Sequence, residues 1–125
     1  MELAKLLKPI APALEQVEAQ IAARAAGKFS VLLRGKRLRP AMLLIAAQAT
    51  GARPDPDAIL AAATVEMVHT ASLIHDDVID SSARRRSGTA LHRLIGVKPA
   101  VIFADLLFVQ ALFGIEPKIS GEVRI

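Results

Sequence analysis

The sequence predicts an all-α protein, a helical bundle whose central helices are very hydrophobic. Hydrophobic residues make up 53% of the 125-residue chain, which is enough to build a core and argues against disorder. Apolar residues recur at spacings of three and four along several segments, as they do on one face of a helix. No segment shows the strict alternation of apolar and polar residues that predicts a half-buried strand. The length corresponds to one domain or part of one.

The N-terminal segment predicts a helix with a single apolar stripe. Its apolar residues recur at helical spacing, at Leu3, Leu7, Ile10, Leu14, Val17 and Ile21. Pro9 and Pro12 interrupt the pattern, so we expect the firm part of the helix to begin near Pro12. A break at residues 27–35 follows.

Three further helices complete the predicted partial bundle of about four to five helices. We expect them at residues 38–50, from 57 to about 80 and at 100–113, with loops at 52–57 and 81–89. Pro40 falls in the first turn of the second helix, where proline is tolerated, and Gly51 ends that helix. Asp57 is a suitable N-cap for the third.

Two apolar stretches are nearly long enough to cross a membrane, but we expect neither to do so. Residues 58–74 are interrupted by Glu66 and residues 99–115 by Asp105, and a charge in mid-span is costly in lipid. We expect both to be buried helices of a soluble bundle. The N-terminus does not resemble a secretory signal and the chain has no cysteine, so we expect a cytoplasmic protein.

The charge balance indicates an anionic partner. Sixteen Lys and Arg against twelve Asp and Glu leave a net charge of +4. Nucleic acid is disfavoured, because the chain has no Trp or Tyr and four Phe, which is a poor supply for stacking bases.

Three carboxylates at residues 76–80 predict a cation site. In a helix, Asp76 and Asp80 share one face and repel each other, while Asp77 points elsewhere. The helix dipole also disfavours anions at a C-terminus. Two carboxylates together with substrate phosphates are the usual ligands of Mg²⁺, so we expect Mg²⁺ here. The alternative is a core helix with a solvated acidic end.

Basic residues on both sides of these carboxylates favour the metal interpretation. Arg84–Arg86 follow within one short loop, and Lys36, Arg37 and Arg39 precede the helix. Arg binds phosphate oxygens through a planar fork, and Lys adds a point charge. The combination predicts a Mg²⁺-assisted diphosphate site.

The predicted third helix also carries an apolar wall. Ser72, His69 and Val65 lie four, seven and eleven residues before Asp76, so they share its face. A polar mouth that leads into an apolar wall suits a substrate with a diphosphate head and a hydrocarbon tail.

Three motifs together resemble the trans-isoprenyl diphosphate synthases, or polyprenyl synthetases. They are Gly-Lys-Arg-Leu-Arg-Pro at residues 35–40, Glu-Met-Val-His-Thr-Ala-Ser-Leu-Ile-His-Asp-Asp-Val-Ile-Asp at residues 66–80, and Arg-Arg at residues 85–86. Their order and spacing are far more specific than an Asp-rich motif alone. The resemblance covers about residues 30–113 and only the N-terminal part of the family's domain. It implies a helical bundle of the isoprenoid synthase type.

The resemblance implies a transferase of prenyl groups that joins isopentenyl diphosphate to an allylic diphosphate. Asp76 and Asp80 would be the catalytic Mg²⁺ ligands. The residues holding isopentenyl diphosphate would be Lys36, Arg39, His69 and Arg86, and Arg85 would hold the allylic diphosphate. The product-length pocket would be lined by Val65, Val68, Ala71 and Ser72. Since Ala71 and Ser72 stand where bulky aromatics would stop growth, we expect a long-chain product.

The chain also departs from the family. No second Asp-rich motif follows Asp105, and residues 114–125 look neither helical nor motif-bearing, so we divide the chain into residues 1–113 and an off-pattern tail at 114–125. We expect Asp105 to be buried with a local partner, and His75 to be structural. The chain alone would be an incomplete synthase. The alternatives are a homo- or hetero-oligomer that supplies the missing helices, and a non-catalytic helical interaction module.

Overall fold

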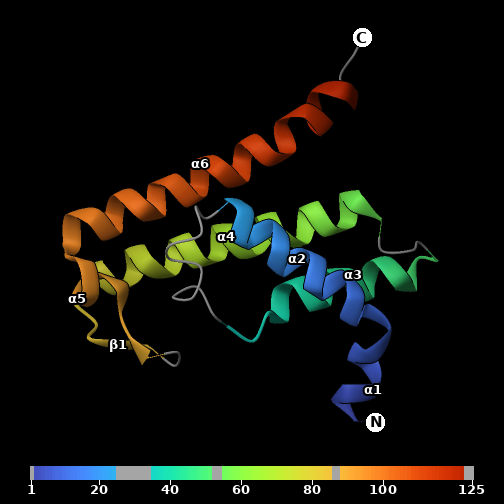
Figure 1. The fold of residues 1–125 in the computed structure, drawn as a ribbon, viewed down its shortest axis with the longest axis horizontal. Helices are drawn as coiled ribbons and strands as arrows, with labels where there is room; N and C mark the ends of the chain where they lie inside the picture. Colours follow the sequence, from blue (N-terminus) through green and yellow to red (C-terminus); the bar gives the residue numbers. More distant parts are fainter. Residues whose placement is uncertain (1, 25–34, 52–54, 86–87, 123–125) are drawn as a thin grey trace.

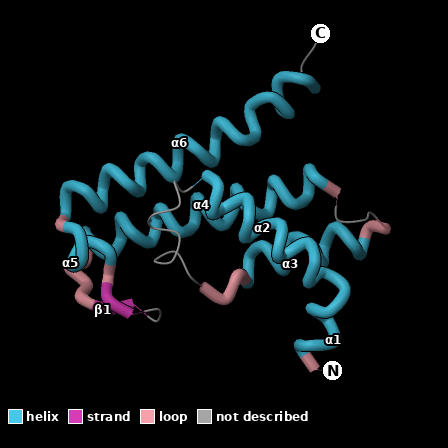
Figure 2. Tube along the Cα trace, in the orientation of Figure 1, coloured by secondary structure: helices cyan, strands magenta, loops and turns pink. Residues whose placement is uncertain are grey.

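The computed structural model describes residues 2–24, 35–51, 55–85 and 88–122 and confirms the all-α fold (Figures 1 and 2). Its helical elements are α1 (Leu3–Leu7), the 3₁₀ turn η1 (Lys8–Ile10), α2 (Ala11–Arg24), α3 (Leu38–Ala49), α4 (Pro56–Ile79), α5 (Leu91–Ile95) and α6 (Val97–Glu122). Two-residue strands β1 (Arg84–Arg85) and β2 (Gly88–Thr89) form an antiparallel hairpin.

Helix α4 is the centre of the bundle. It packs against α6 along much of its length and also contacts α2 and α3 (Figure 1). Its inward residues include Ala62, Ala63 and Ala71, all fully buried. Because alanine side chains are short, the neighbouring helices can approach the α4 backbone closely. Large residues on the other helices fill the remaining space, among them Ile10, Val17, Leu44 and Leu107.

The N-terminal helix begins earlier than predicted. The chain is already helical at Leu3, and Pro9 lies at the start of the 3₁₀ turn η1. Pro12 is the second residue of α2. Each proline therefore occupies the first turn of its element, where its missing N–H is not needed. The apolar stripe faces the core as expected, with Ile10, Val17 and Ile21 buried.

The N-cap of helix α4 lies two residues earlier than predicted, at Asp55 rather than Asp57. The Asp55 carboxylate accepts a hydrogen bond of 2.8 Å from the Ala58 backbone N–H. Pro56 follows at the first helical position, where its fixed φ suits the helix. Asp57 then lies in the first turn, where the helix dipole favours an acidic residue.

The segment between α4 and α6 holds structure that the prediction missed. The expected loop at 81–89 contains the β1–β2 hairpin, and α5 follows it. Gly96 separates α5 from α6 with a φ of 94°, a conformation that other residues rarely adopt. A five-residue helix and a two-residue strand are too short to leave a periodic pattern in the sequence.

Helix α6 is longer than predicted at both ends. It starts at Val97 rather than near residue 100 and continues to Glu122, so the expectation that the tail after residue 113 is not helical is wrong up to that point. Pro117 and Gly121 are poor helix formers, but extending an existing helix is easier than starting one. Figure 1 shows the C-terminal part of α6 extending beyond the other helices.

Two helices are long and apolar enough to cross a membrane by length and composition alone. They are Pro56–Ile79 in α4 and Val97–Gly114 in α6. Helix α4, however, turns the polar side chains of Thr64 and Glu66 into the bundle, where both are buried. Its apolar character is therefore explained by packing against three neighbouring helices.

Removing the α4 cap should destabilise the fold. We expect Asp55→Ala to lower the free energy of unfolding by about 1 kcal/mol, because the Ala58 N–H loses its acceptor. Chemical denaturation measures this change. Asp55→Asn keeps a capping oxygen and should retain most of the stability, so an equal loss in both variants would contradict the assignment.

Two methionines offer a matched test of the core. Met67 on α4 is 1% exposed, whereas Met42 on α3 is 64% exposed. We expect Met67→Ala to cost about 2–5 kcal/mol, because it leaves a cavity beside α4. The same substitution at Met42 should change the free energy of unfolding by less than about 0.5 kcal/mol. Equal effects in thermal or denaturant unfolding would place the core elsewhere.

Candidate functional site

One face of α4 is left uncovered by the other described helices, and we call it the open face. It comprises Val65, His69, Ser72, Asp76 and Asp80. Val65 is 40% exposed, both aspartates are exposed, and His69 and Ser72 are half-buried. Met67 and Ile74, on the opposite side of the helix, belong to the core. The structure thus confirms that the five predicted residues share one side of the helix.

The four predicted pocket residues do not all lie on this face. Val65 and Ser72 do, and Val68 packs partly against the core at its edge. Ala71 is instead fully buried in the core, because it lies on the far side of the helix from Asp76. The Ser72 hydroxyl donates to the His69 carbonyl at 2.6 Å, so its donor is satisfied within the helix.

Asp76 and Asp80 end the open face at the C-terminus of α4. Asp80 is the C-cap, and its backbone N–H donates to the Asp76 carbonyl at 2.8 Å. Neither carboxylate has an ion-pair partner within the part of the chain that the structure describes. Asp77, by contrast, is buried, so the third carboxylate does point elsewhere.

These two carboxylates suit Mg²⁺ only in combination with other ligands. Among the described residues, no group of three or more His, Cys, Asp or Glu side chains comes together as a complete metal site. Mg²⁺ is commonly held by one or two carboxylates together with substrate phosphates and water. Asp76 and Asp80 therefore fit one edge of such a site.

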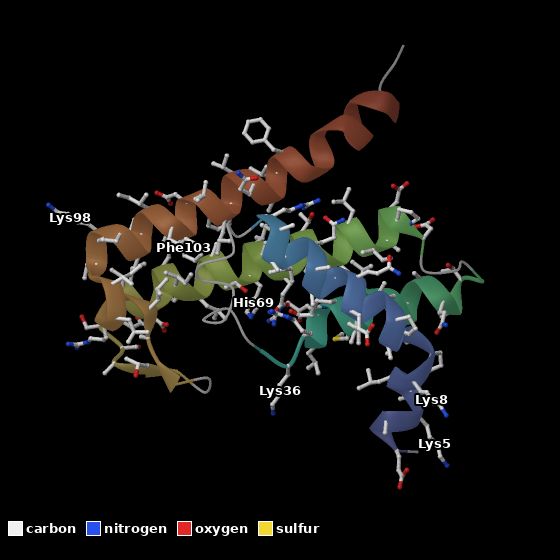
Figure 3. All side chains as sticks on the ribbon, viewed as in Figure 1. Lys5, Lys8, Lys36, His69, Lys98 and Phe103 are labelled. Carbon is white, nitrogen blue, oxygen red and sulfur yellow. The ribbon has the colours of Figure 1, made fainter. Side chains whose placement is uncertain are left out.

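The basic segment before α3 presents two of its three cations to solvent. Lys36 and Arg39 are exposed, and Figure 3 shows the Lys36 side chain pointing away from the helices, while His69 lies near the middle of the molecule. Arg37, between them, turns inward and has a side chain only 11% exposed. The predicted cations thus separate into two outward groups and one buried group.

Arg37 connects the basic segment to both α2 and α4. Its Nη1 donates to Glu66 Oε1 at 3.1 Å, and its Nη2 donates to Glu18 Oε2 at 3.2 Å. Its Nε also donates to Glu18. Burial alone would lower the pKa of Arg37, but hydrogen bonds and charges from Glu18 and Glu66 raise it above its ordinary value. The guanidinium is therefore a permanent cation.

The prediction counted Arg37 among the cations of the diphosphate site and gave Glu66 no role in that site. The available signal was Glu66 itself, a carboxylate in an otherwise apolar helix whose side chain is 8% exposed in the structure. A buried carboxylate needs a cationic or hydrogen-bonding partner. Because Glu66 lies one turn before His69, its bond to Arg37 anchors the basic segment to α4 one turn from His69.

The structure tests the remaining basic residues only in part. The backbone of Arg85 lies in β1, but its side chain is outside the described part of the structure. Arg86 lies outside the described residues altogether. Their predicted roles in diphosphate binding stay predictions.

His75 and Asp105 join α4 to α6 beside the open face. His75 Nε2 lies 3.1 Å from Asp105 Oδ1, without the alignment of a hydrogen bond, and the His75 ring packs 5.8 Å from the ring of Phe108. The structural role expected for His75 agrees with these contacts. The expectation for Asp105 was wrong, since its side chain is 64% exposed and its partner lies on another helix.

Comparison with known sequences identifies one family. The polyprenyl synthetase family pattern matches residues 22–118. The chain is 43% identical over 89 residues to a prenyl transferase of Porphyra purpurea, covering 70% of this chain and 28% of that protein. It is 40% identical over 86 residues to a short chain isoprenyl diphosphate synthase of Methanothermobacter thermautotrophicus, covering 69% and 26%. The chain thus spans about a quarter of the length of these relatives.

Solved structures agree with this match. A decaprenyl diphosphate synthase from Rhodobacter capsulatus aligns with a TM-score of 0.79 at 34% identity, covering 88% of this chain and 37% of that one. A polyprenyl synthase from Caulobacter crescentus CB15, complexed with calcium and isoprenyl diphosphate, aligns with a TM-score of 0.78 at 31% identity, covering 91% and 37%. The fold and the sequence lead to the same conclusion: this chain belongs to the polyprenyl synthetase family.

Proposed function

We propose that this chain is the diphosphate-binding part of a prenyltransferase that joins isopentenyl diphosphate to an allylic diphosphate. The open face of α4 carries the proposal. It places two carboxylates without ion-pair partners among the described residues at one end of a row formed by Ser72, His69 and Val65. Glu66, which holds the basic segment through Arg37, lies one turn from His69. Family membership and the neighbour complexed with isoprenyl diphosphate support the same chemistry.

Asp76 and Asp80 are the proposed Mg²⁺ ligands. They would hold a Mg²⁺ ion, whose positive charge would stabilise the negative charge that develops on the leaving diphosphate. The carboxylates orient that diphosphate at the mouth of the open face. Calcium in the Caulobacter neighbour supports a hard divalent cation, since both ions prefer oxygen ligands.

The proposed contacts to isopentenyl diphosphate come from two segments of the chain. Lys36 and Arg39 belong to the basic segment, and His69 belongs to the open face of α4. Arg86 would complete this set, and Arg85 would hold the allylic diphosphate. A guanidinium group binds phosphate oxygens through two parallel hydrogen bonds, and the Lys36 ammonium adds a compact charge. Together they neutralise a substrate that carries several negative charges.

We propose a long-chain product. No aromatic residue occurs between Gly51 and Asp80, so no bulky ring on α4 closes the wall that runs from Asp76 toward Val65. Each helical turn along this wall adds about 5.4 Å of depth. Val65 and Ser72 line it and Val68 borders it, whereas Ala71 supports it from the core.

The chain alone supplies one half of the proposed site. It has no second Asp-rich motif after Asp105. Helix α6 meanwhile exposes a continuous apolar stripe, formed by Ile102, Leu106, Val109, Leu112 and Phe113. An exposed apolar stripe of this length supports a homo- or hetero-oligomer that covers it. We propose that the protein acts as part of a homo- or hetero-oligomer.

We propose that the protein is cytoplasmic and does not span a membrane. The absence of cysteine fits a reducing compartment. The inward ion pair of Glu66 supports a packed rather than a lipid-facing α4.

Removing one carboxylate should weaken the metal-dependent binding. We expect Mg²⁺ to tighten binding of geranyl diphosphate to the chain, and Asp76→Asn to weaken the Mg²⁺-dependent affinity at least about tenfold. A contact between charged groups is worth about 1.5–3 kcal/mol, and about 1.4 kcal/mol corresponds to a factor of ten. Isothermal titration calorimetry measures both affinities.

Asp57→Asn is the matched control, because it makes the same charge change at the opposite end of α4. It should leave the Mg²⁺-dependent affinity within about twofold of the wild type. An unchanged affinity in Asp76→Asn would remove Asp76 from the site.

Product formation tests the completeness of the site. With labelled isopentenyl diphosphate, an allylic primer and Mg²⁺, we expect the purified chain to bind substrate but to form no lipid-extractable product, while a full-length relative is active in parallel. Product from this chain would mean that assembly supplies the missing ligands, and its length would test the open wall. The absence of Mg²⁺-dependent diphosphate binding would favour the alternative, a non-catalytic helical subunit.

A further inference from the structure

Arg37 has an unusual place in the basic segment. It lies between the exposed Lys36 and the first turn of α3, yet its side chain is nearly buried. All three of its contacts with carboxylates are to other helices, Glu18 on α2 and Glu66 on α4. The residue thus ties a substrate-binding segment to two core helices.

The backbone at Arg37 requires this support. Its φ of 53° and ψ of 37° place it in the left-handed helical region. There the Cβ of an L-residue approaches the following carbonyl too closely, so residues other than glycine rarely occupy it. Such a conformation persists where the surroundings hold it. The hydrogen bonds from the Arg37 guanidinium to Glu18 and Glu66 stabilise this conformation.

The conformation of Arg37 sets the direction of both of its cationic neighbours. Its carbonyl accepts the first bond of α3, from the Ala41 N–H at 3.0 Å, so α3 starts from this residue. Arg39 lies in the first turn that follows, and Lys36 directly precedes it. With Arg37 turned inward, these two side chains remain exposed.

We propose that Arg37 is a positioning residue for diphosphate binding. Through its ion pair with Glu66, it fixes the segment that carries Lys36 and Arg39 to α4, one turn from His69, and these two side chains contact the substrate. The inference rests on the proposed function and adds a residue to it. We assign Arg37 no direct contact with the diphosphate, because its side chain is 11% exposed and three of its five N–H donors already bond to Glu18 and Glu66.

Titration with isopentenyl diphosphate at fixed Mg²⁺ concentration tests this role. We expect Arg37→Gln to weaken the affinity about tenfold, which is the lower end of the effect of removing a supporting group from a binding site. In a Lys36→Ala background the same substitution should cost only about threefold, since part of what Arg37 positions is already gone. A full tenfold loss in that background would overturn the proposal.

Three further variants separate positioning from general folding. Arg37→Lys keeps the charge and one contact, so it should restore part of the affinity, and it replaces Arg37→Gln if that variant fails to fold. Glu66→Gln should weaken binding as Arg37→Gln does. Glu18→Gln removes the partner that is half-exposed, with 51% of its side chain accessible, and should change the affinity by no more than about twofold. An effect of Glu18→Gln as large as that of Glu66→Gln would contradict Glu66 as the anchor.

The outcomes also separate this inference from the proposed function. If the wild type binds isopentenyl diphosphate and Arg37→Gln binds it equally well, only the positioning role is refuted. If the folded wild type shows no binding, the proposed function fails and the inference falls with it. Thermal unfolding of each variant shows that the compared proteins are folded.

Discussion

The structure depends on the packing of one apolar helix on three of its sides. Helix α4 contacts α2, α3 and α6, and its buried alanines let those helices approach closely. Close packing gains dispersion energy from many small contacts and leaves little room for rearrangement. The fourth side of α4 is therefore presented rigidly, and it is the side that carries Asp76, Asp80 and His69. A rigid support of this kind is what a metal-assisted site requires.

A buried ion pair joins the two motifs that the proposed site needs. Glu66 belongs to the same helix as the aspartates, and Arg37 belongs to the basic segment. Burying two charges costs desolvation energy that their attraction roughly offsets, so such a pair adds little net stability. Its effect is on geometry: separating the partners would leave a charge unpaired in the interior, and the chain therefore keeps one arrangement. The proposed diphosphate contacts of Lys36 and Arg39 depend on that arrangement.

The outer helix α6 packs against the core on one side and exposes apolar residues on the other. Its inward residues Phe103, Leu107 and Ala111 pack against the bundle, whereas the stripe from Ile102 to Phe113 is exposed. A helix that is apolar on most sides is normally buried on most sides. The relatives of this chain are about two and a half times its length, since 89 matched residues make up 28% of one and 86 make up 26% of the other. The bundle described here corresponds to little more than a third of the solved homologous chains. The exposed stripe is consistent with a larger assembly around the same core.

The sequence alone determined the fold class, the long helix α4 and the face on which Val65, His69, Ser72, Asp76 and Asp80 lie. These features follow from periodicity, which is a local property of the chain. The prolines at 9 and 12 were misjudged because a proline's effect depends on its place within a turn, and the length of α6 because extending a helix is easier than starting one. The same periodicity would have placed Ala71 in the core, since it lies five residues before Asp76. Only the tertiary structure decided that Arg37 turns inward to Glu66. Which residues meet across 29 positions of sequence depends on how whole helices pack, and no local pattern records that.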